Sequence, residues 1–230
     1  MDRKDVKDLE TFAYVLRRTN YGEADRILNL ITPEGKISVM ARGVRKAKSK
    51  LAGSIEMFTC SRVNLHFGRG DLATLTGAKM EKFQAEILKD FDKMELAGEI
   101  LRVTERVTEG VADSGYYKIV DMALTELNNG AETRLVETWF FLNVAKLSGE
   151  EVNFYRDSEG EKLEAGAKYS WDKNERALRC DDGGEIDANV IKILRLMVSA
   201  DLAVIKKIRG VEEYLPVLVK IGKVFREVVK

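Results

Sequence analysis

Five cations stand within nine positions of the segment ARGVRKAKSKL, which covers residues 41–51. No acidic residue occurs between positions 36 and 55. Like charges at this spacing repel one another, so the segment is favourable only when it is solvated or bound to an anion. These residue types predict a loop that binds an anionic partner, the alternative being a solvated loop without a ligand. The five cations are Arg42, Arg45, Lys46, Lys48 and Lys50.

The positive charge of this loop belongs to an uneven distribution of charge along the chain. The 230 residues contain 38 Lys and Arg and 38 Asp and Glu, so the formal net charge is zero. Residues 1–80 carry 15 basic and 9 acidic side chains, a net charge of +6, which leaves −6 for residues 81–230. The first part therefore suits an anionic partner, whereas the second part would repel one.

Residue types that commonly act in catalysis do not form a constellation in this sequence. The only histidine, His66, lies on the polar side of the segment RVNLHF, with no metal ligand or nucleophile at a suitable spacing. Cys60 begins the same segment and is expected to pack as a small, buried or half-buried side chain. The carboxylates of Glu23 and Asp25 stand beside a turn, where acids commonly cap the backbone. We therefore expect no enzymatic activity and no catalytic residues.

Cysteine usage and hydropathy indicate the compartment. Cys60 and Cys180 are the only cysteines, and their separation matches neither a disulfide framework nor a zinc ribbon. The N-terminal segment MDRKDVKDLE is charged, and the longest apolar runs are interrupted by Lys and Arg. We therefore expect a cytoplasmic protein without a signal peptide, a membrane span, a metal or another cofactor.

Short strands separated by turns are predicted for residues 1–80. The segments TFAYVLR, DRILNLIT, ISVMAR, SRVNLHF and LATLTGA alternate or are rich in branched apolar residues, and PEGK and GRGD punctuate them. The basic segment falls between the third and fourth strands. Five antiparallel strands with such an insertion are typical of an OB-type barrel, a fold that often binds single-stranded nucleic acid.

The periodicity changes to that of helices near Glu81. Apolar residues recur at steps of three and four, for example from Leu135 to Leu147. The pattern lapses at about residues 150–186, where KYSWDKNERALRC predicts two short strands around a turn. We predict an α+β protein with a barrel domain at residues 1–80 and a separable, mostly helical domain with a small β insertion at residues 81–230.

Aromatic side chains in the first part could stack on bases. Most of them are expected in the core, and the clearest exception is Tyr21 in the turn TNYGEA. Together with the basic segment, this makes nucleic-acid binding the leading hypothesis.

The segment LRRTNYGEADRILNLITPEGKISVMARGVRKAKSKLAGSIEMF resembles the amino-terminal part of the RecO family of recombination mediators. The family has a turn with Tyr-Gly-Glu, a second turn with Thr followed by Gly, and an Ala-x-Gly-x-Arg-Lys-x-x-Ser segment. GRGDLATLTGA is similar to the hairpin that follows in the family. The likeness is specific for residues 14–80 and extends only to the layout of elements beyond them. The matching residues are Tyr21, Gly22, Glu23, Thr32, Gly35, Ala41, Gly43, Arg45, Lys46 and Ser49.

Two departures from the family pattern change what the resemblance implies. The family commonly has proline where this chain has Ala47, which loosens the loop and keeps its charge. Many members also carry four zinc-binding cysteines in the β insertion, where this chain retains only Cys180. A closed zinc site cannot be built from one thiolate, so packing around Tyr169, Trp171 and Leu178 is expected to hold the insertion.

The resemblance implies a protein that binds single- and double-stranded DNA and anneals complementary strands. It also implies assistance to RecA loading together with RecR, and binding of the acidic C-terminal tail of single-strand binding protein by the helical domain. The expected tail contacts are Arg195, Lys206, Lys207 and Arg209. The expected DNA contacts are Arg17, Arg18, Tyr21, Arg42, Arg45, Lys46, Lys48, Lys50 and Arg69.

Two other classes of protein stay open at this stage. An RNA-binding OB module of translation or ribosome assembly would need the same amino-terminal chemistry. A protein-interaction adaptor, whose basic loop binds an acidic partner, would show no affinity for polynucleotides.

Overall fold

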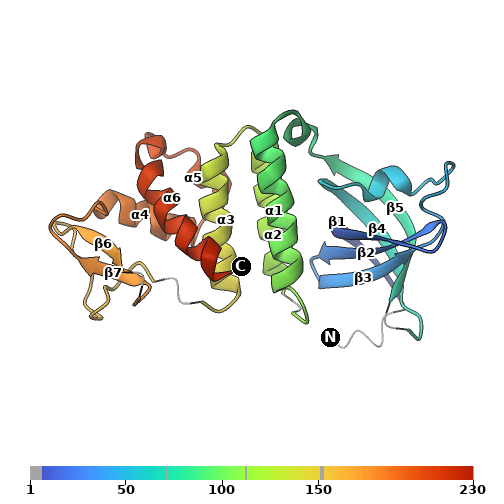
Figure 1. Cartoon of the computed structure of the whole chain (residues 1–230), viewed down its shortest axis with the longest axis horizontal. Helices are drawn as coiled ribbons and strands as arrows, with labels where there is room; N and C mark the ends of the chain where they lie inside the picture. Colours follow the sequence, from blue (N-terminus) through green and yellow to red (C-terminus); the bar gives the residue numbers. More distant parts are fainter. Residues whose placement is uncertain (1–6, 71, 112, 151–152, 173, 230) are drawn as a thin grey trace. The chain divides into compact units, whose positions relative to one another are not determined.

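The computed structural model describes residues 7–70, 72–111, 113–150, 153–172 and 174–229, and its elements form two compact units, Met1–Asn128 and Asn129–Lys230. The first unit contains a ring of five strands in the order β1-β2-β3-β5-β4, closed by the pairing of β4 with β1 (Figure 1). This confirms the predicted OB-type barrel, but the expectation that all its strands pair in antiparallel fashion is wrong, because β3 and β5 pair in parallel within the ring. The strands are β1 (Asp8–Tyr21), β2 (Asp25–Thr32), β3 (Gly35–Ala41), β4 (Thr59–His66) and β5 (Ala73–Phe83).

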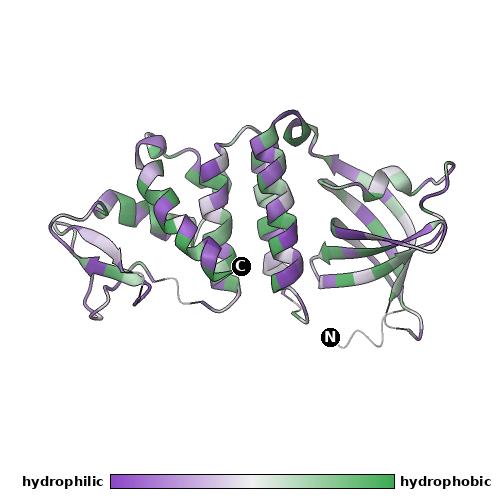
Figure 2. Ribbon diagram, viewed as in Figure 1, coloured by the Kyte–Doolittle hydropathy of each residue, from purple (hydrophilic) through white to green (hydrophobic). Residues whose placement is uncertain are grey.

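Alternation of side chains builds the barrel core. Along β3, Ile37, Val39 and Ala41 point into the core, and the residues between them point outward. Bands of opposite hydropathy along the strands show this alternation in Figure 2. The short 3-10 helix η2 (Ala52–Ile55) adds Ile55 to the same core. The barrel is therefore filled by side chains, and any ligand must use its outer surface or its loops.

Two helices complete the first unit by packing on β1, β2 and β3. Strand β5 continues beyond the predicted change of pattern, because Phe83 still pairs with Thr59 of β4. The α-helix begins only at Phe91, where the side chain of Asp90 caps it by accepting a hydrogen bond from the backbone N–H of Lys93. The elements after the barrel are η3 (Ala85–Lys89), α1 (Phe91–Val107) and α2 (Ser114–Asn128).

A polar cluster joins the barrel to α2. The hydroxyl of Tyr14 donates to Asp121 at 2.7 Å, and Lys82 reaches the same carboxylate at 3.2 Å. Sγ of Cys60 lies 3.5 Å from the hydroxyl of Tyr117. Burial, the nearby Asp121 and the neighbouring thiol raise the pKa of the Tyr14 hydroxyl well above its ordinary value. The Tyr14 hydroxyl therefore stays protonated, and its hydrogen bond to Asp121 links the barrel to α2.

The second unit is helical and contains the predicted β insertion. Strands β6 and β7 form a two-stranded antiparallel sheet, in which Trp171 pairs with Leu178. Pro216 lies inside the last helix without ending it. The elements are α3 (Thr133–Leu147), β6 (Tyr169–Asp172), β7 (Ala177–Cys180), α4 (Ala188–Met197), α5 (Leu202–Ile205) and α6 (Val211–Val228).

Helices α3 and α6 approach closely at one glycine. A Cβ atom added to Gly222 would lie 2.8 Å from Oγ1 and 3.0 Å from Cα of Thr138, closer than side chains normally pack. Gly222→Ala is therefore expected to lower the free energy of unfolding by about 1–3 kcal/mol in denaturant titrations. Gly166→Ala, which meets no atom within 4 Å, serves as the control. Equal stability of the two variants would contradict this packing.

Candidate nucleic-acid interface

The basic loop, defined as residues 42–50, connects β3 to η2. Its backbone is folded into consecutive turns, since Lys46 N–H donates to the carbonyl of Gly43 at 3.1 Å and Ser49 N–H to that of Lys46 at 2.9 Å. Gly43 has φ of +64°, a left-handed conformation in which glycine is favoured. The loop therefore has a defined backbone although its side chains are mostly exposed.

The turn between β1 and β2 anchors this loop. The carboxylate of Asp25 accepts a hydrogen bond from Gly43 N–H at 2.6 Å. Arg45 N–H donates to the carbonyl of Ala24 at 2.9 Å, and the Arg45 guanidinium donates to the carbonyl of Gly22 at 3.1 Å. Two loops far apart in the sequence thus form one surface. The expectation that Asp25 caps a backbone group is confirmed, but its partner lies in another loop.

The cations of the basic loop are not neutralised by the protein. Within the described part of the chain, no ion pair involves Arg42, Lys46, Lys48 or Lys50, and all four side chains are exposed. Arg45 bonds only to main-chain oxygen, which leaves its charge uncompensated. Phosphate groups, which carry full negative charge and several acceptor oxygens, are suited to such a surface.

Tyr21 lies at the end of β1, beside the turn that holds the loop, and 55% of it is exposed. Tyr14 and Phe58, by contrast, are buried. The prediction that Tyr21 is exposed is confirmed, although Phe12 of β1 is exposed as well. The ring of Tyr21 is available for stacking against a base, next to cations that suit phosphates.

The other predicted DNA contacts have different surroundings. Arg17, on the outer side of β1, lies 3.7 Å from Glu105 of α1. Arg18 pairs with Glu56 at 2.5 Å. Arg69 is exposed on the loop between β4 and β5, and no described contact joins it to the basic loop. The structure therefore brings Tyr21 and the basic loop together and gives Arg17 and Arg18 internal partners.

The candidates for catalytic chemistry occupy ordinary positions. His66 is exposed at the end of β4, where its Nδ1 lies 2.8 Å from Asp8. Cys60 is buried, and burial raises the pKa of its thiol, which disfavours the nucleophilic thiolate. The expectation that His66 is a surface residue and Cys60 a packed one is confirmed.

The predicted protein contacts lie in the second unit. Arg195 of α4 donates to the carbonyl of Phe154 at 2.7 Å and covers the ring of Tyr155, with 4.5 Å from its Cζ to the ring centroid. Arg195 thus supports the β insertion. Lys207 and Arg209 are exposed after α5.

Lys206 borders a surface cavity of about 280 Å³. The cavity is lined by apolar side chains such as Leu135 and Leu215 and also by the carboxylate-bearing Glu132 and Glu212. A second cavity of about 440 Å³ lies between α6 and the insertion. Its apolar floor is bordered by Lys220 and Lys223, which sequence reasoning missed because their helical spacing alone does not distinguish them from solvated lysines.

An aromatic cluster holds the β insertion against the helices. The ring of Trp171 lies 5.4 Å from that of Phe225 and 6.5 Å from that of Phe154, measured between centroids. Tyr169 and Leu178 are buried, as expected for packing residues. Among the described residues, no three His, Cys, Asp or Glu side chains come together, and Cys180 is exposed. The residues present therefore do not fit the zinc site of the family.

Metal analysis of the purified protein is expected to find well below one zinc per chain. A chelator should leave the melting temperature unchanged, because the insertion is packed by aromatic side chains and not by ligands. A stoichiometric zinc content, or a melting temperature that falls with chelator, would contradict this prediction. Cys180→Ser provides the control and is expected to melt like the parent.

These features define the class of protein: an OB-type barrel with an unneutralised basic loop, followed by helices that carry a small β insertion. Family models agree with both parts, since the description "Recombination protein O N terminal" matches residues 6–83 and "Recombination protein O C terminal" matches residues 88–224. The chain belongs to the RecO family of DNA repair proteins.

Individual relatives agree with this assignment. A DNA repair protein RecO of Dehalococcoides mccartyi is 29% identical over 217 residues, which cover 90% of this chain and 85% of the relative. One of Roseiflexus sp. is 31% identical over 146 residues, 63% of this chain and 51% of the relative. One of Bacillus cytotoxicus is 37% identical over 103 residues, 44% of this chain and 41% of the relative. Among the described residues, no helix is long and apolar enough to span a bilayer.

Proposed function

We propose that this protein is a recombination mediator of the cytoplasm that binds single- and double-stranded DNA, anneals complementary strands, and assists RecA loading together with RecR. The observation that carries the proposal is the basic loop of an OB-type barrel, whose cations have no carboxylate partner in the part of the chain that the structure describes. The proposed role requires no bond breaking, metal or cofactor. We therefore assign no catalytic residue.

The proposed contacts go to phosphates. Lys and Arg side chains of the basic loop would neutralise the phosphate backbone of the strand without reading base edges. Binding should therefore tolerate any sequence and weaken with salt. Annealing follows when two strands are neutralised on the same surface, because their mutual repulsion falls. Tyr21 adds base stacking next to this surface. Arg69 is proposed to contact the strand where it passes the loop between β4 and β5.

The second unit is proposed to bind proteins. The acidic C-terminal tail of single-strand binding protein would need cations beside apolar side chains, and Lys206 borders a cavity that Leu135 and Leu215 line together with the carboxylates of Glu132 and Glu212. Arg195, Lys207 and Arg209 remain proposed contacts for the same tail. RecR is proposed as a partner on the basis of family membership, without an assigned surface.

A strand-annealing assay with the purified protein tests the proposal. Two complementary oligonucleotides, one carrying a fluorophore and the other a quencher, should anneal faster in the presence of the protein. Affinity for single-stranded DNA is then compared with affinity for a structured RNA of equal length. Tighter binding of the RNA without annealing would favour the RNA-binding module, and the absence of affinity for either polynucleotide would favour the adaptor.

A further inference from the structure

The outer face of strands β2 and β3 is the surface on which OB-type barrels commonly bind oligonucleotides. Leu28 and Leu30 of β2 point into the barrel core, so the residues between and beside them point outward. Asn29 pairs with Ser38 of β3, and Ile31 pairs with Lys36. In this chain α1 and α2 pack on these strands, and Ile31 is buried and the side chain of Lys36 nearly so, so the cation that a polynucleotide could still reach is Arg17 of β1 at the edge of the face.

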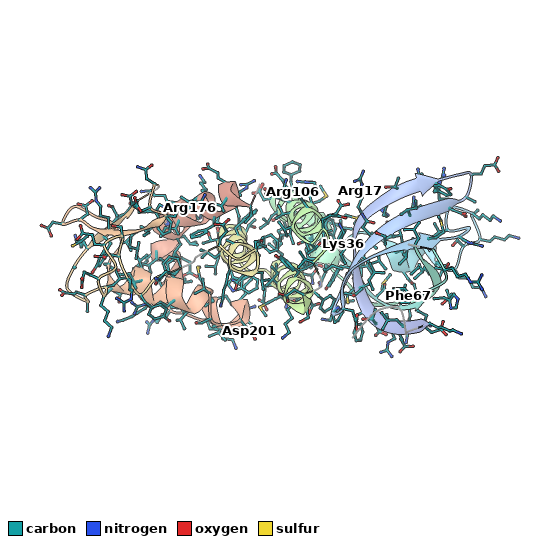
Figure 3. All side chains as sticks on the ribbon, turned by 90° about the horizontal axis from the view of Figure 1, so that it is seen from below. Arg17, Lys36, Phe67, Arg106, Arg176 and Asp201 are labelled. Carbon is teal, nitrogen blue, oxygen red and sulfur yellow. The ribbon has the colours of Figure 1, made fainter. Side chains whose placement is uncertain are left out.

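Helix α1 places carboxylates on this face. Glu105 accepts a hydrogen bond from the side-chain amide of Asn29 at 2.8 Å and lies 3.7 Å from the guanidinium of Arg17. Glu109 accepts one from the ammonium of Lys36, which also donates to the backbone carbonyl of Glu105 at 3.0 Å. Figure 3 shows Arg17 and Lys36 on the barrel strands beside these helices.

The burial of these groups differs in a way that matters for a ligand. The side chain of Lys36 is only 9% exposed, so its ammonium is committed to α1. The side chain of Arg17 is 64% exposed, and its contact with Glu105 is made through one guanidinium nitrogen, Nη1. A phosphate could therefore reach Arg17 but would meet the charge of Glu105 there, at a cost of Coulomb repulsion.

We propose that Glu105, with Glu109 one turn further along α1, keeps the polynucleotide away from Arg17 at the edge of the strand face that the helices cover, and thereby confines it to the basic loop and the adjoining turn. The inference rests on the proposed DNA binding and adds to it the path that the strand takes. Glu105 occupies the place beside Arg17 that a phosphate would otherwise take. Arg17 then contributes little to binding in the parent protein, in contrast to the cations of the basic loop.

The test is the double variant Glu105→Gln/Glu109→Gln, which keeps the side-chain size and one acceptor oxygen at each position and removes both charges. Affinity for a fluorescent oligothymidine is measured over a series of salt concentrations. The plot of log affinity against log salt is expected to steepen by about 0.7, the value of one additional phosphate contact on a single strand. Adding Arg17→Ala to the double variant should remove that gain, whereas Arg17→Ala should change the slope much less in the parent.

The matched control is Asp92→Asn/Glu95→Gln, which removes two charges from exposed positions of the same helix that make no described contact with a strand. The control variant should bind slightly more tightly, because its net charge is less negative. Adding Arg17→Ala to it should change the salt slope no more than Arg17→Ala does in the parent. If the two double variants behave alike, or if Arg17→Ala flattens the slope equally in the parent, the proposed path is wrong. Circular dichroism checks the fold, and should the Gln variant unfold, Arg17→Ala in the parent still decides.

A further variant, in which Arg45, Lys46, Lys48 and Lys50 of the basic loop are replaced by Ala, distinguishes this inference from the proposed function. If the basic loop binds DNA, this variant loses affinity whatever the result with Glu105→Gln/Glu109→Gln. Parent-like binding by that variant overturns the proposed function and the path together. Loss of binding by that variant, combined with identical behaviour of the two double variants, overturns only the path.

Discussion

Replacing Arg45, Lys46, Lys48 and Lys50 by Ala is expected to flatten the salt dependence of single-stranded DNA binding by about 2 to 3 in the slope of log affinity against log salt. The four side chains supply roughly four phosphate contacts, and each contributes about 0.7 to that slope. Annealing should be lost, since the two strands would no longer be neutralised together. The measurement is fluorescence anisotropy over a salt series, followed by the annealing assay.

The fold should survive this substitution. The four side chains are exposed, and only Arg45 uses its side chain in a hydrogen bond, to a main-chain carbonyl. The change in stability is therefore expected to stay near about 0.5 kcal/mol per site or below. A control that replaces four exposed lysines elsewhere removes the same charge and should retain annealing. Parent-like affinity and slope in the loop variant would show that the loop is merely solvated. The control lysines are Lys118, Lys162, Lys168 and Lys192.

A fragment of residues 1–128 is expected to fold by itself, whereas a fragment of residues 1–80 is expected to be largely unfolded. The shorter fragment lacks α1 and α2, which pack on the barrel and cover Tyr14 and Ile31. Exposing an apolar side chain of this size costs about 1.5–3 kcal/mol, and a few such losses equal the stability of a typical domain. Thermal unfolding followed by circular dichroism should show a cooperative transition only for the longer fragment.

This experiment also tests the boundary that the sequence predicts near residue 80. The change of periodicity marks where strands give way to helices, but it does not show on which partner the first helices pack. A cooperative transition in the fragment of residues 1–80, with a folded complementary fragment of residues 81–230, would support the predicted boundary. It would also show that α1 and α2 contribute less to the barrel than their contacts indicate.

Local patterns in the sequence were sufficient to predict the barrel. Each strand is marked by alternation or by a run of branched apolar residues, and turns such as PEGK separate them, so the pairing of β1 with β2, of β2 with β3 and of β4 with β5 follows. The pairing of β3 with β5 and of β1 with β4, which closes the ring, joins strands that are not neighbours in the sequence. The exposed position of Tyr21 could be predicted for the same reason, because it stands in a turn. Residue types and spacing also indicated the basic loop, which needs no partner to be recognised as a cluster of charge.

Contacts between distant segments could not be predicted in this way. The bond from Gly43 N–H to Asp25 joins two loops whose relative position depends on the closure of the barrel. Arg17 looks like a free cation in the sequence, and only the packing of α1 places Glu105 beside it. Charge patterns thus identified which residues are cationic, whereas the fold determines which of these cations are already paired.

The anchoring of the basic loop has a thermodynamic consequence. A mobile segment must give up conformational freedom of about 1–2 kcal/mol per residue when a ligand fixes its backbone. Here the hydrogen bonds to Asp25 and Ala24 already restrict the backbone at Gly43 and Arg45 in the free protein. Only side-chain rotamers remain to be ordered when a strand is bound. Under the proposed function, the loop would release one strand and accept another without refolding, which suits strand annealing.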